Sequence, residues 1–479
     1  METLNALIDT FNGWLYGYIL VALLVAGGIY FTVRLQFQPT VLLREAIRTL
    51  LDCNAKGKGT MSSFQALMVS TASRVGTGNI IGVTAAILAG GPGAIFWMWV
   101  IAVFGSASAF VESTLAQMYK CRDASGHYYG GPAYYIKKAL HAPVFGGVFA
   151  AFVILLYMGG FNALCSFNTT DFICNYARDV PHITAYVGAA LAVLAGIVIM
   201  GGGKFISRVT QFLVPIMAVG YIVLAVAVMV LHVTELPGVL ASILAQAFDI
   251  HSAFGGFLGA AIMMGIKRGL YSNEAGVGSA PNAAASADVR HPANQGFSQF
   301  LSVFIDTILI CSATAFIVLC SGVDPSGYVA GTDNTRFLQD CMSASFGAGG
   351  GVLLTGALVI FAYTTLVGNY FYAEQSVRYF YPQAQGDKRF MTVYRIVAVL
   401  VIFAGSQFKA AFAWNLSDLI MGVMALINIP VCVILGKRVY KALWDYMIQR
   451  NAGMDPTFNP VKVLGTDEGM ECWTKATAG

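Results

Sequence analysis

Apolar stretches of about 20 residues recur along the whole chain, and they constrain its fold more than any other feature. Hydrophobic residues make up 57% of the 479 residues and charged residues only 11%, whereas soluble domains have about 25% charged residues. A helix of about 20 residues crosses a bilayer core, because each residue rises about 1.5 Å and the core is about 30 Å thick. The sequence therefore predicts an all-α polytopic membrane protein and excludes soluble folds.

Hydropathy predicts eleven transmembrane helices, and the basic residues of the connections alternate with them. Of the Lys and Arg residues, 24 lie on one side and three on the other, and Arg74 lies inside a span. Basic connections face the cytoplasm. We therefore expect the N-terminus outside and the C-terminus inside the plasma membrane of a prokaryote. The net charge is only +4. The position of the basic residues orients the helices, and so small an excess indicates no nucleic-acid partner. The predicted spans are residues 14–33, 64–89, 93–118, 147–168, 184–201, 210–232, 253–280, 297–320, 350–374, 391–408 and 414–435.

Glycine and polar residues interrupt the second predicted span at residues 70–82. In lipid, a helix opens only where its freed backbone groups face protein, water or a ligand. We therefore expect residues 75–79 to form an unwound hinge that faces a ligand. The spacing of Gly78 and Gly82 also fits a small-residue packing face between helices.

A second interruption falls in the seventh predicted span, where residues 255–265 are rich in glycine and residues 266–281 are polar. The second and seventh spans are five helices apart and so cross in opposite directions. Two sets of five helices that each begin with a broken helix are typical of an inverted repeat, in which transporters bind substrate at the repeat interface. The predicted segments are an N-terminal helix with a basic linker (1–63), a first repeat (64–250), a second repeat (251–436) and a cytoplasmic tail (437–479).

Two motifs at these interruptions resemble those of the alanine/glycine:cation symporter family, the sodium:alanine symporters of prokaryotes. They read Gly76-Thr-Gly-Asn-Ile-Ile-Gly82 and Gly269-Leu-Tyr-Ser-Asn-Glu-Ala-Gly-Val-Gly-Ser-Ala-Pro281, and the resemblance covers essentially the whole chain. It implies the leucine-transporter-type fold of the amino acid-polyamine-cation superfamily, preceded by one extra helix. It also implies Na⁺-coupled uptake of small neutral amino acids such as alanine, glycine and D-alanine, with no organic cofactor and no catalytic residue.

The resemblance also implies where the substrate and the ion bind. The amino-acid carboxylate would meet the N–H groups of Thr77 and Gly78 at the positive end of a half-helix. Opened carbonyls around Met264 and Gly265 would take the ammonium. Asn79 stays open as a ligand of a second cation, a substrate contact or a helix cap. The implied sodium ligands are the hydroxyls of Thr364 and Thr365 and the carbonyls of Ser73, Val75 and Phe361.

Side chains that face the hinge should set the size of the substrate. The candidates are Phe161, Asn162, Phe167, Met263 and Met264, although such residues are equally typical of a core. Several members of the family carry Trp where this chain has Asn369. A polar side chain there would admit a larger or more polar amino acid, such as glutamine.

Ionisable residues inside a span are costly and are therefore candidates for function. Arg74 lies about ten residues, or roughly 15 Å, into its span. We expect it to pair with Glu274 or Glu112, either as an inner gate or as a static brace. Asp306 is the candidate carrier if H⁺ rather than Na⁺ drives transport. The residues expected to snorkel at helix ends are Lys267, Arg268 and Glu374.

Two other classes of protein stay open as alternatives. An ion channel would expose a continuous polar stripe, and an enzyme would need a nucleophile or a metal-ligand motif. The predicted spans show neither. We expect a monomer whose partners are a small neutral amino acid, Na⁺ and the lipid bilayer.

Overall fold

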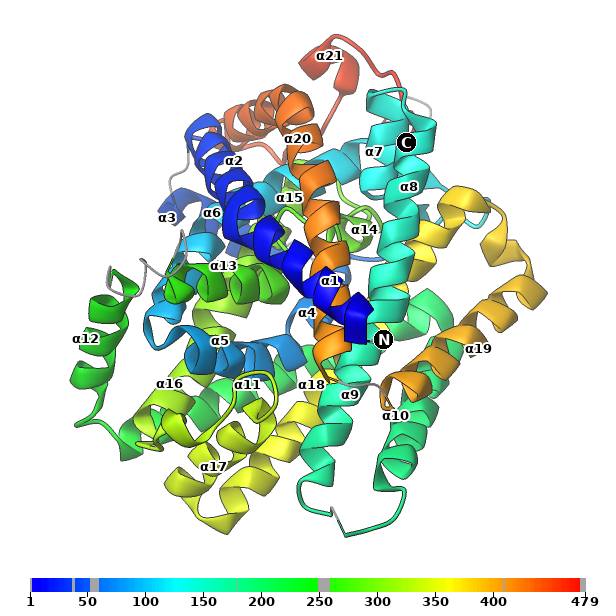
Figure 1. The fold of residues 1–479 in the computed structure, drawn as a ribbon. Helices are drawn as coiled ribbons and strands as arrows, with labels where there is room; N and C mark the ends of the chain where they lie inside the picture. Colours follow the sequence, from blue (N-terminus) through cyan, green and yellow to red (C-terminus); the bar gives the residue numbers. More distant parts are fainter. Residues whose placement is uncertain are drawn as a thin grey trace.

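A computed structural model describes residues 2–36, 39–51, 60–177, 179–248, 259–407 and 410–473 (Figure 1). These residues are almost entirely helical, which confirms the all-α prediction. Within them, the strands Cys121–Arg122 (β1) and Tyr128–Tyr129 (β2) pair antiparallel in a short hairpin.

Eight helical stretches of the described chain are long and apolar enough to cross a membrane. Three of them join two helices through a π-helical turn, at Leu15–Ile19 (η1), Leu155–Gly160 (η3) and Phe304–Cys311 (η5). The eight stretches are Asn5–Arg34 (α1, Glu2–Trp14, and α2, Leu20–Arg34), Gly93–Met118 (α6), Pro143–Cys174 (α8, Pro143–Ile154, and α9, Phe161–Cys174), Ile183–Met200 (α10), Gly202–Leu231 (α11), Ala293–Cys320 (α15, Ala293–Val303, and α16, Ser312–Cys320), Ala348–Phe380 (α18) and Trp414–Asn451 (within α20, Ala410–Asn451).

The second predicted span is broken, as expected. The side chain of Ser62 and that of Gln65 cap the start of α4 (Ser63–Arg74). This helix ends at Val75, which has extended backbone with ψ of 90°. A π-helical turn at Gly78–Gly82 (η2) then leads into α5 (Val83–Gly90). The interruption is narrower than the expected residues 75–79, because only Val75 and Gly76 leave the helical path.

The seventh predicted span breaks later than expected. Helix α13 (Ala260–Asn273) is unbroken, so the predicted opening at Met264 and Gly265 is wrong. Gly265 instead allows close packing on α6, because an added Cβ would overlap the carbonyl oxygen of Ala94. The helix ends at Glu274, whose φ of 53° is left-handed, and a non-helical segment leads to α14 (Pro281–Ala284). The predicted start of this span, residues 253–258, lies outside the described residues.

Shorter elements connect these helices. One of them, α19, coincides with the tenth predicted span and carries three basic residues. The connecting elements are α3 (Pro39–Leu51), α7 (Pro132–Ala139), α12 (Leu236–Ala247), η6 (Pro325–Gly327), α17 (Asn334–Phe346), η7 (Ala384–Gly386), α19 (Lys388–Gly405), α21 (Pro460–Leu464) and η8 (Glu471–Trp473).

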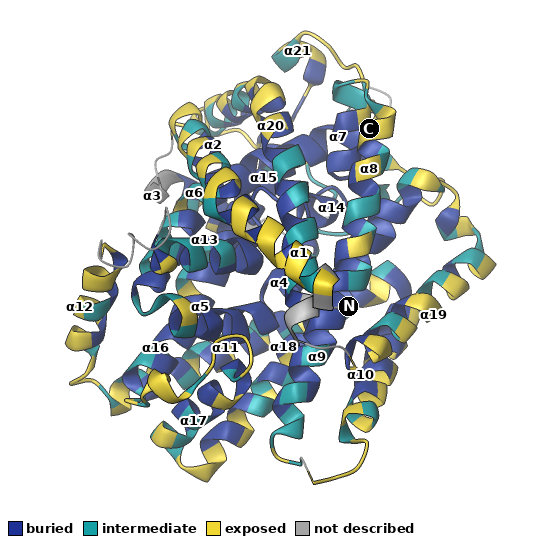
Figure 2. Cartoon of the chain, viewed as in Figure 1, coloured by how far each residue is buried: buried dark blue, intermediate teal, exposed yellow. Residues whose placement is uncertain are grey.

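The broken helix lies in the interior of the protein. Every residue from 66 to 87 is buried, and Figure 2 shows α4 and α15 as buried elements, whereas α10, α12 and α19 at the periphery carry exposed residues. The exposed side chains of these outer helices are largely apolar, as a lipid-facing surface requires. Polar residues of the break therefore have to find their partners within the protein.

The C-terminal tail folds back over the ends of the membrane helices, near α7 in Figure 1. The Trp473 indole N–H donates to the carbonyl of Gln117 at the end of α6 (2.9 Å). The backbone N–H of Phe458 donates to the carbonyl of Arg290 in the connection before α15 (3.1 Å). The tail thus ties the end of α6 to the start of α15, a role that the sequence did not indicate.

His291 is buried beneath this tail. Its Nδ1 accepts the N–H of Ala293 (3.1 Å), its Nε2 lies 3.5 Å from Asp445, and its ring packs on Phe458 (5.3 Å between centroids). Burial lowers the pKa of His291 below its usual 6.5, so the folded protein holds fewer protons there than the unfolded chain. The stability that this residue contributes is therefore present above about pH 6.5 and decreases as the pH falls below it.

We expect amide hydrogens of residues 452–473 to become less protected when the pH falls from about 7.5 to about 5.5, after correction for intrinsic exchange. His291→Asn keeps a hydrogen-bond acceptor in place of Nδ1 but cannot titrate, so it should remove most of this pH dependence. Hydrogen-exchange mass spectrometry measures both proteins. Equal pH dependence in the two would contradict the role of His291.

Candidate functional site at the broken helix

The break after α4 is held open by its own side chains. Asn79 Oδ1 accepts the N–H of Gly76 (2.9 Å), and the N–H of Asn79 donates to the carbonyl of Gly76 (3.2 Å). The N–H groups of Thr77 and Gly78 then begin the second half-helix, and the first N–H groups of a helix have no partner within it. They form a positive helix end that suits an anionic group.

A small cavity lies at the break. Its volume is about 10 Å³, close to the space of one water molecule, so its walls nearly touch. The structure brings together eight residues that the sequence singles out, namely Ser73, Arg74, Thr77, Gly78, Phe161, Glu274, Thr365 and Asn369. Gly76 of the predicted hinge also lines it, and the structure adds two residues that the sequence analysis missed, Cys165 and Tyr271.

Aromatic rings close one side of this cavity. The ring of Tyr271 lies on Gly78, where an added Cβ would be 2.5 Å from Cε1. Its centroid is 4.8 Å from that of Phe161 and 4.9 Å from that of Trp414. Phe161 of α9 and Tyr271 of α13 thus form this wall, and Trp414 of α20 packs behind Tyr271. The only sequence signal for Tyr271 is its place in the motif 269–281.

Oxygen atoms of α4 and α18 converge on the other side. Thr365 Oγ1 donates to the carbonyl of Ala72 (3.0 Å) and lies 3.5 Å from that of Val75. The neighbouring Thr364 Oγ1 bonds back within α18, to the carbonyls of Phe361 (2.9 Å) and Ile360 (3.2 Å), and lies 3.3 Å from Met217 Sδ of α11. Hydroxyl and carbonyl oxygens of this kind suit Na⁺. The structure brings the carbonyl of Ala72, rather than that of Ser73, to Thr365.

Ser73 instead begins a chain of side-chain amides. Its Oγ donates to Asn369 Oδ1 (2.6 Å), and Asn369 Nδ2 donates to Asn162 Oδ1 (3.0 Å). Asn162 Nδ2 in turn lies 3.4 Å from the carbonyl of Leu366. Asn369 is therefore engaged with α4 and α9, and its amide forms part of the cavity wall.

Asn79 also binds the carboxylate of Asp306 in η5. Asn79 Nδ2 lies 2.6 Å from Asp306 Oδ1, and Ser272 Oγ donates to Oδ2 (2.6 Å), as does Thr307 Oγ1 (2.9 Å). The hydrogen bond that Asn79 accepts from the N–H of Gly76 is of the kind expected of a helix cap, one of the three roles left open for Asn79. The same side chain connects the break in α4 to the end of α13 and to η5.

Arg74 forms no ion pair in the part of the chain that the structure describes. Its Nη1 donates to Gln299 Oε1 (3.0 Å), and its Nε and Nη2 have no partner among the described residues. Arg74 and Glu274 line the same small cavity. The expected direct pair with Glu274 or Glu112 is therefore not formed in this conformation.

The two expected partners of Arg74 instead hold the second break. Glu274 accepts a hydrogen bond from Ser279 Oγ (2.7 Å). Glu112 accepts one from Asn428 Nδ2 (2.7 Å), which also donates to the carbonyl of Gly276 (3.0 Å). Both carboxylates thus stabilise the non-helical segment after α13.

The other predicted residues lie away from the small cavity. Phe167 and Met264 line a separate cavity of about 760 Å³. Met263 is half-buried on α13, next to Gly265, which packs on α6. The ring of Phe361 packs on that of Tyr221, with 5.2 Å between centroids, so only its carbonyl faces the threonines.

Two basic residues that line this larger cavity, Lys267 and Arg268, pair with a buried carboxylate behind it. Asp418 of α20 accepts from Lys267 (2.8 Å) and lies 3.5 Å from Arg268. Both basic residues share the cavity with Asn5 and with residues 330–335, which the charge count assigned to the outer side. The sequence analysis counted Lys267 and Arg268 among the inner connections and expected them to snorkel at a helix end. Both expectations are wrong, because α13 continues past these residues and breaks only at Glu274.

An all-helical membrane protein whose two broken helices meet at a small, polar, buried cavity has the arrangement of a secondary transporter. The chain belongs to the sodium:alanine symporter family, whose family model matches residues 1–460. Na⁺-coupled amino-acid symport is thus its class of activity, and it is a multi-pass membrane transporter rather than an enzyme.

Relatives and solved structures agree with this membership. The chain is 41% identical to the probable sodium/glutamine symporter GlnT of Bacillus subtilis, over 98% of this chain and 96% of that protein. It is 36% identical to the sodium/alanine symporter AgcS of Methanococcus maripaludis, over 88% and 93% of the two chains. MhsT in complex with L-phenylalanine has the same leucine-transporter-type fold, with a TM-score of 0.53 and 14% identity over 87% and 97% of the two chains.

Added methyl groups at the break provide a direct test of its geometry. A Cβ at residue 76 would overlap Thr365 Oγ1, and overpacking costs about 1–3 kcal/mol of folding stability. Where this strain falls on the substrate-bound state, the same free energy corresponds to about 5- to 150-fold in affinity. We expect Gly76→Ala to weaken binding of labelled alanine to the purified, monodisperse protein by about fivefold or more. Gly220→Ala in α11, where an added Cβ meets no atom within 4 Å, is the matched control. Equal affinities of the two variants would contradict this geometry.

Proposed function

We propose that this protein imports small neutral amino acids, chiefly alanine and glycine and also D-alanine, together with Na⁺ by alternating access. The observation that carries the proposal is the small cavity at the α4 break. It has a helix start on one side, clustered oxygens on another and aromatic rings over the top. Since its volume is about 10 Å³, the walls have to part for any substrate, and a small side chain requires the least movement.

In this proposal, the backbone of the second half-helix binds the substrate carboxylate. The N–H groups of Thr77 and Gly78 supply hydrogen bonds and a positive helix end. Glu274 lines the same cavity and supplies the negative charge for the substrate ammonium. It takes the place of the carbonyls of Met264 and Gly265, which belong to an unbroken helix.

Na⁺ would bind between α4 and α18. Its ligands are the hydroxyls of Thr364 and Thr365 and the carbonyls of Ala72, Val75 and Phe361, which already lie within hydrogen-bond distance of those hydroxyls. One Na⁺ entering down about 100 mV releases roughly 2.3 kcal/mol, and a tenfold gradient adds about 1.4 kcal/mol. The sum supports an amino-acid gradient of several hundred-fold.

The proposed topology has eleven crossings. Eight continuous helical stretches, the broken pair α4 and α5, the broken α13 region and α19 supply them. The N-terminus is outside and the tail inside the inner membrane of a prokaryote. The first repeat covers residues 64–250 and the second residues 251–436, and the protein works as a monomer.

Two specific observations favour variants of this function. The relative named as a probable sodium/glutamine symporter, together with the polar Asn369 in the cavity wall, favours glutamine as a second candidate substrate. The buried Asp306 in contact with Asn79 is the candidate for coupling to H⁺. Competition of alanine uptake by glycine, D-alanine, serine and glutamine separates the substrates.

Uptake of labelled alanine into proteoliposomes tests the coupling. We expect accumulation with an inward Na⁺ gradient and none with an equal K⁺ gradient. A pH gradient alone should leave the internal alanine at the external concentration. Uptake that follows the pH gradient and ignores Na⁺ would overturn Na⁺ coupling.

Substitution of Thr365 tests the ion site. Thr365→Ala removes a proposed ligand, so we expect the half-saturating Na⁺ concentration for alanine uptake to rise about tenfold or more, equivalent to about 1.4 kcal/mol. Thr365→Ser keeps the hydroxyl and should restore most of the affinity. Thr355→Ala is the control on the same helix, because Thr355 Oγ1 bonds back to the carbonyl of Gly351 (2.7 Å). An unchanged Na⁺ dependence in Thr365→Ala would show that Na⁺ binds at another place in the protein.

A further inference from the structure

A cavity of about 570 Å³ opens on the face that carries the basic connections, within the size range of small-molecule sites. It lies between α18, the β1–β2 hairpin and the start of α11. Along α18 it begins at Phe371, two residues beyond Asn369 of the central cavity. It is therefore close to the central cavity but has its own walls.

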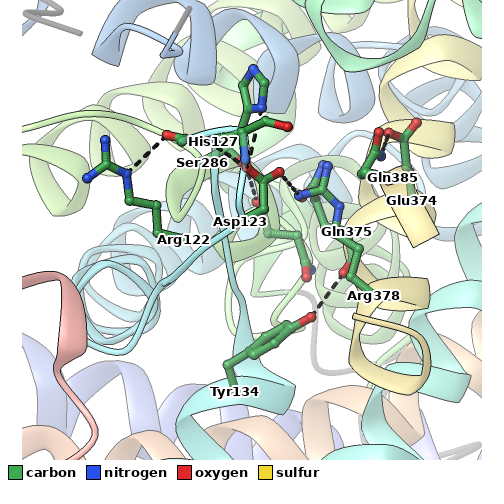
Figure 3. A network of polar contacts seen from close by, with 12 residues as sticks. Arg122, Asp123, His127, Tyr134, Ser286, Glu374, Gln375, Arg378 and Gln385 are labelled. Carbon is green, nitrogen blue, oxygen red and sulfur yellow. Dashed lines mark hydrogen bonds and ion pairs between the residues drawn. The ribbon is translucent and has the colours of Figure 1, made fainter. Parts of the chain in front are cut away.

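Buried charges of both signs line this cavity. Glu374 and Arg378 lie one turn apart on the same face of α18 and are 1% and 6% exposed. Glu374 Oε1 accepts from Gln385, and Arg378 Nη1 is 3.5 Å from Asp123 Oδ2 (Figure 3). Glu374 Oε2 and Arg378 Nε have no partner among the described residues. A buried charge with an unmet hydrogen bond is costly unless a ligand satisfies it.

The start of α11 supplies positive potential on the opposite wall. Arg395 donates to the carbonyl of Met200 (3.0 Å) and lies against Gly202, where an added Cβ would be 2.7 Å from Nη2. Lys204 lines the cavity beside it. Within the described chain, neither basic side chain forms an ion pair. Arg395 thus bonds the last carbonyl of α10, where a cation is favourable, and also lies beside the N–H groups that begin α11, where an anionic group would be favourable.

We propose that this cavity is a second binding site for the zwitterionic amino acid that the protein transports, an inference that rests on the proposed function. The carboxylate binds at the start of α11 with Arg395, and the ammonium binds Glu374. Glu374 and Arg395 line the same cavity, and α18 and the start of α11 meet there, because a Cβ at Gly203 would be 3.2 Å from Phe371 Cε2. An inorganic anion would leave Glu374 unmatched, and a simple cation would leave the start of α11 unmatched. A zwitterion satisfies both.

Binding stoichiometry tests this proposal. Labelled alanine is titrated at saturating Na⁺ against the full-length protein in nanodiscs. We expect two equivalents per chain for the unmodified protein. Glu374→Gln keeps the shape of the side chain and removes its charge, so this variant should bind one equivalent of alanine. The affinity and Na⁺ dependence of that equivalent should match those of the tighter of the two sites in the unmodified protein. The retained equivalent also shows that the variant is folded. Glu468→Gln, at an exposed position of the tail, is the matched control and should keep two.

The outcomes separate the two proposals. No alanine binding by the unmodified protein would refute the proposed function itself. One equivalent in the unmodified protein, or two in Glu374→Gln, would overturn only the second site. Inorganic phosphate is added as a competitor in a parallel titration. Phosphate is used at about 1 mM, a concentration at which only a site with a Kd of about 1 mM or lower is substantially occupied. Complete displacement of the second equivalent of alanine would show a general anion site and would also overturn the proposal.

Discussion

A helix in lipid must satisfy its own backbone hydrogen bonds, and this chain departs from that rule at Val75 and Gly76. Side chains from distant helices compensate for the departure. Asn79 caps the open turn from within, Thr365 of α18 bonds the carbonyls exposed before it, and Thr314 of α16 donates to the carbonyl of Asn79 (2.8 Å). The break therefore holds together only as long as these helices remain packed around it.

The same compensating contacts explain how an ion and a substrate would be coupled. An ion between Thr365 and the α4 carbonyls would replace hydrogen bonds that now join α4 to α18. A substrate carboxylate at Thr77 would enter the cavity that Arg74 also lines. Asn79 links both to Asp306 and Ser272, at the end of α13. A change at the break in α4 can therefore act on the second broken helix directly, through the hydrogen bonds of Asn79.

Composition and glycine patterning were sufficient to predict the all-α membrane fold and the break in the second span, because both follow from the energetics of polar groups in lipid. The end of α13 was not predictable in the same way. Gly265 interrupts the sequence pattern but serves close packing on α6, and a single sequence does not distinguish a packing glycine from a hinge glycine. The partner of Arg74 and the expected snorkelling of Lys267 were also misjudged, because ion pairing depends on tertiary packing. Tyr271 was missed because an aromatic residue in a membrane helix is ordinarily core.

The central claim is that the break between Val75 and Gly78 binds the amino acid through its backbone. The most direct measurement is an experimental structure of the protein determined in Na⁺ and alanine. The account predicts density for the alanine carboxylate at the N–H groups of Thr77 and Gly78, with its methyl group toward the rings of Phe161 and Tyr271. Alanine bound elsewhere, with the half-helix start engaged only by protein groups, would contradict it.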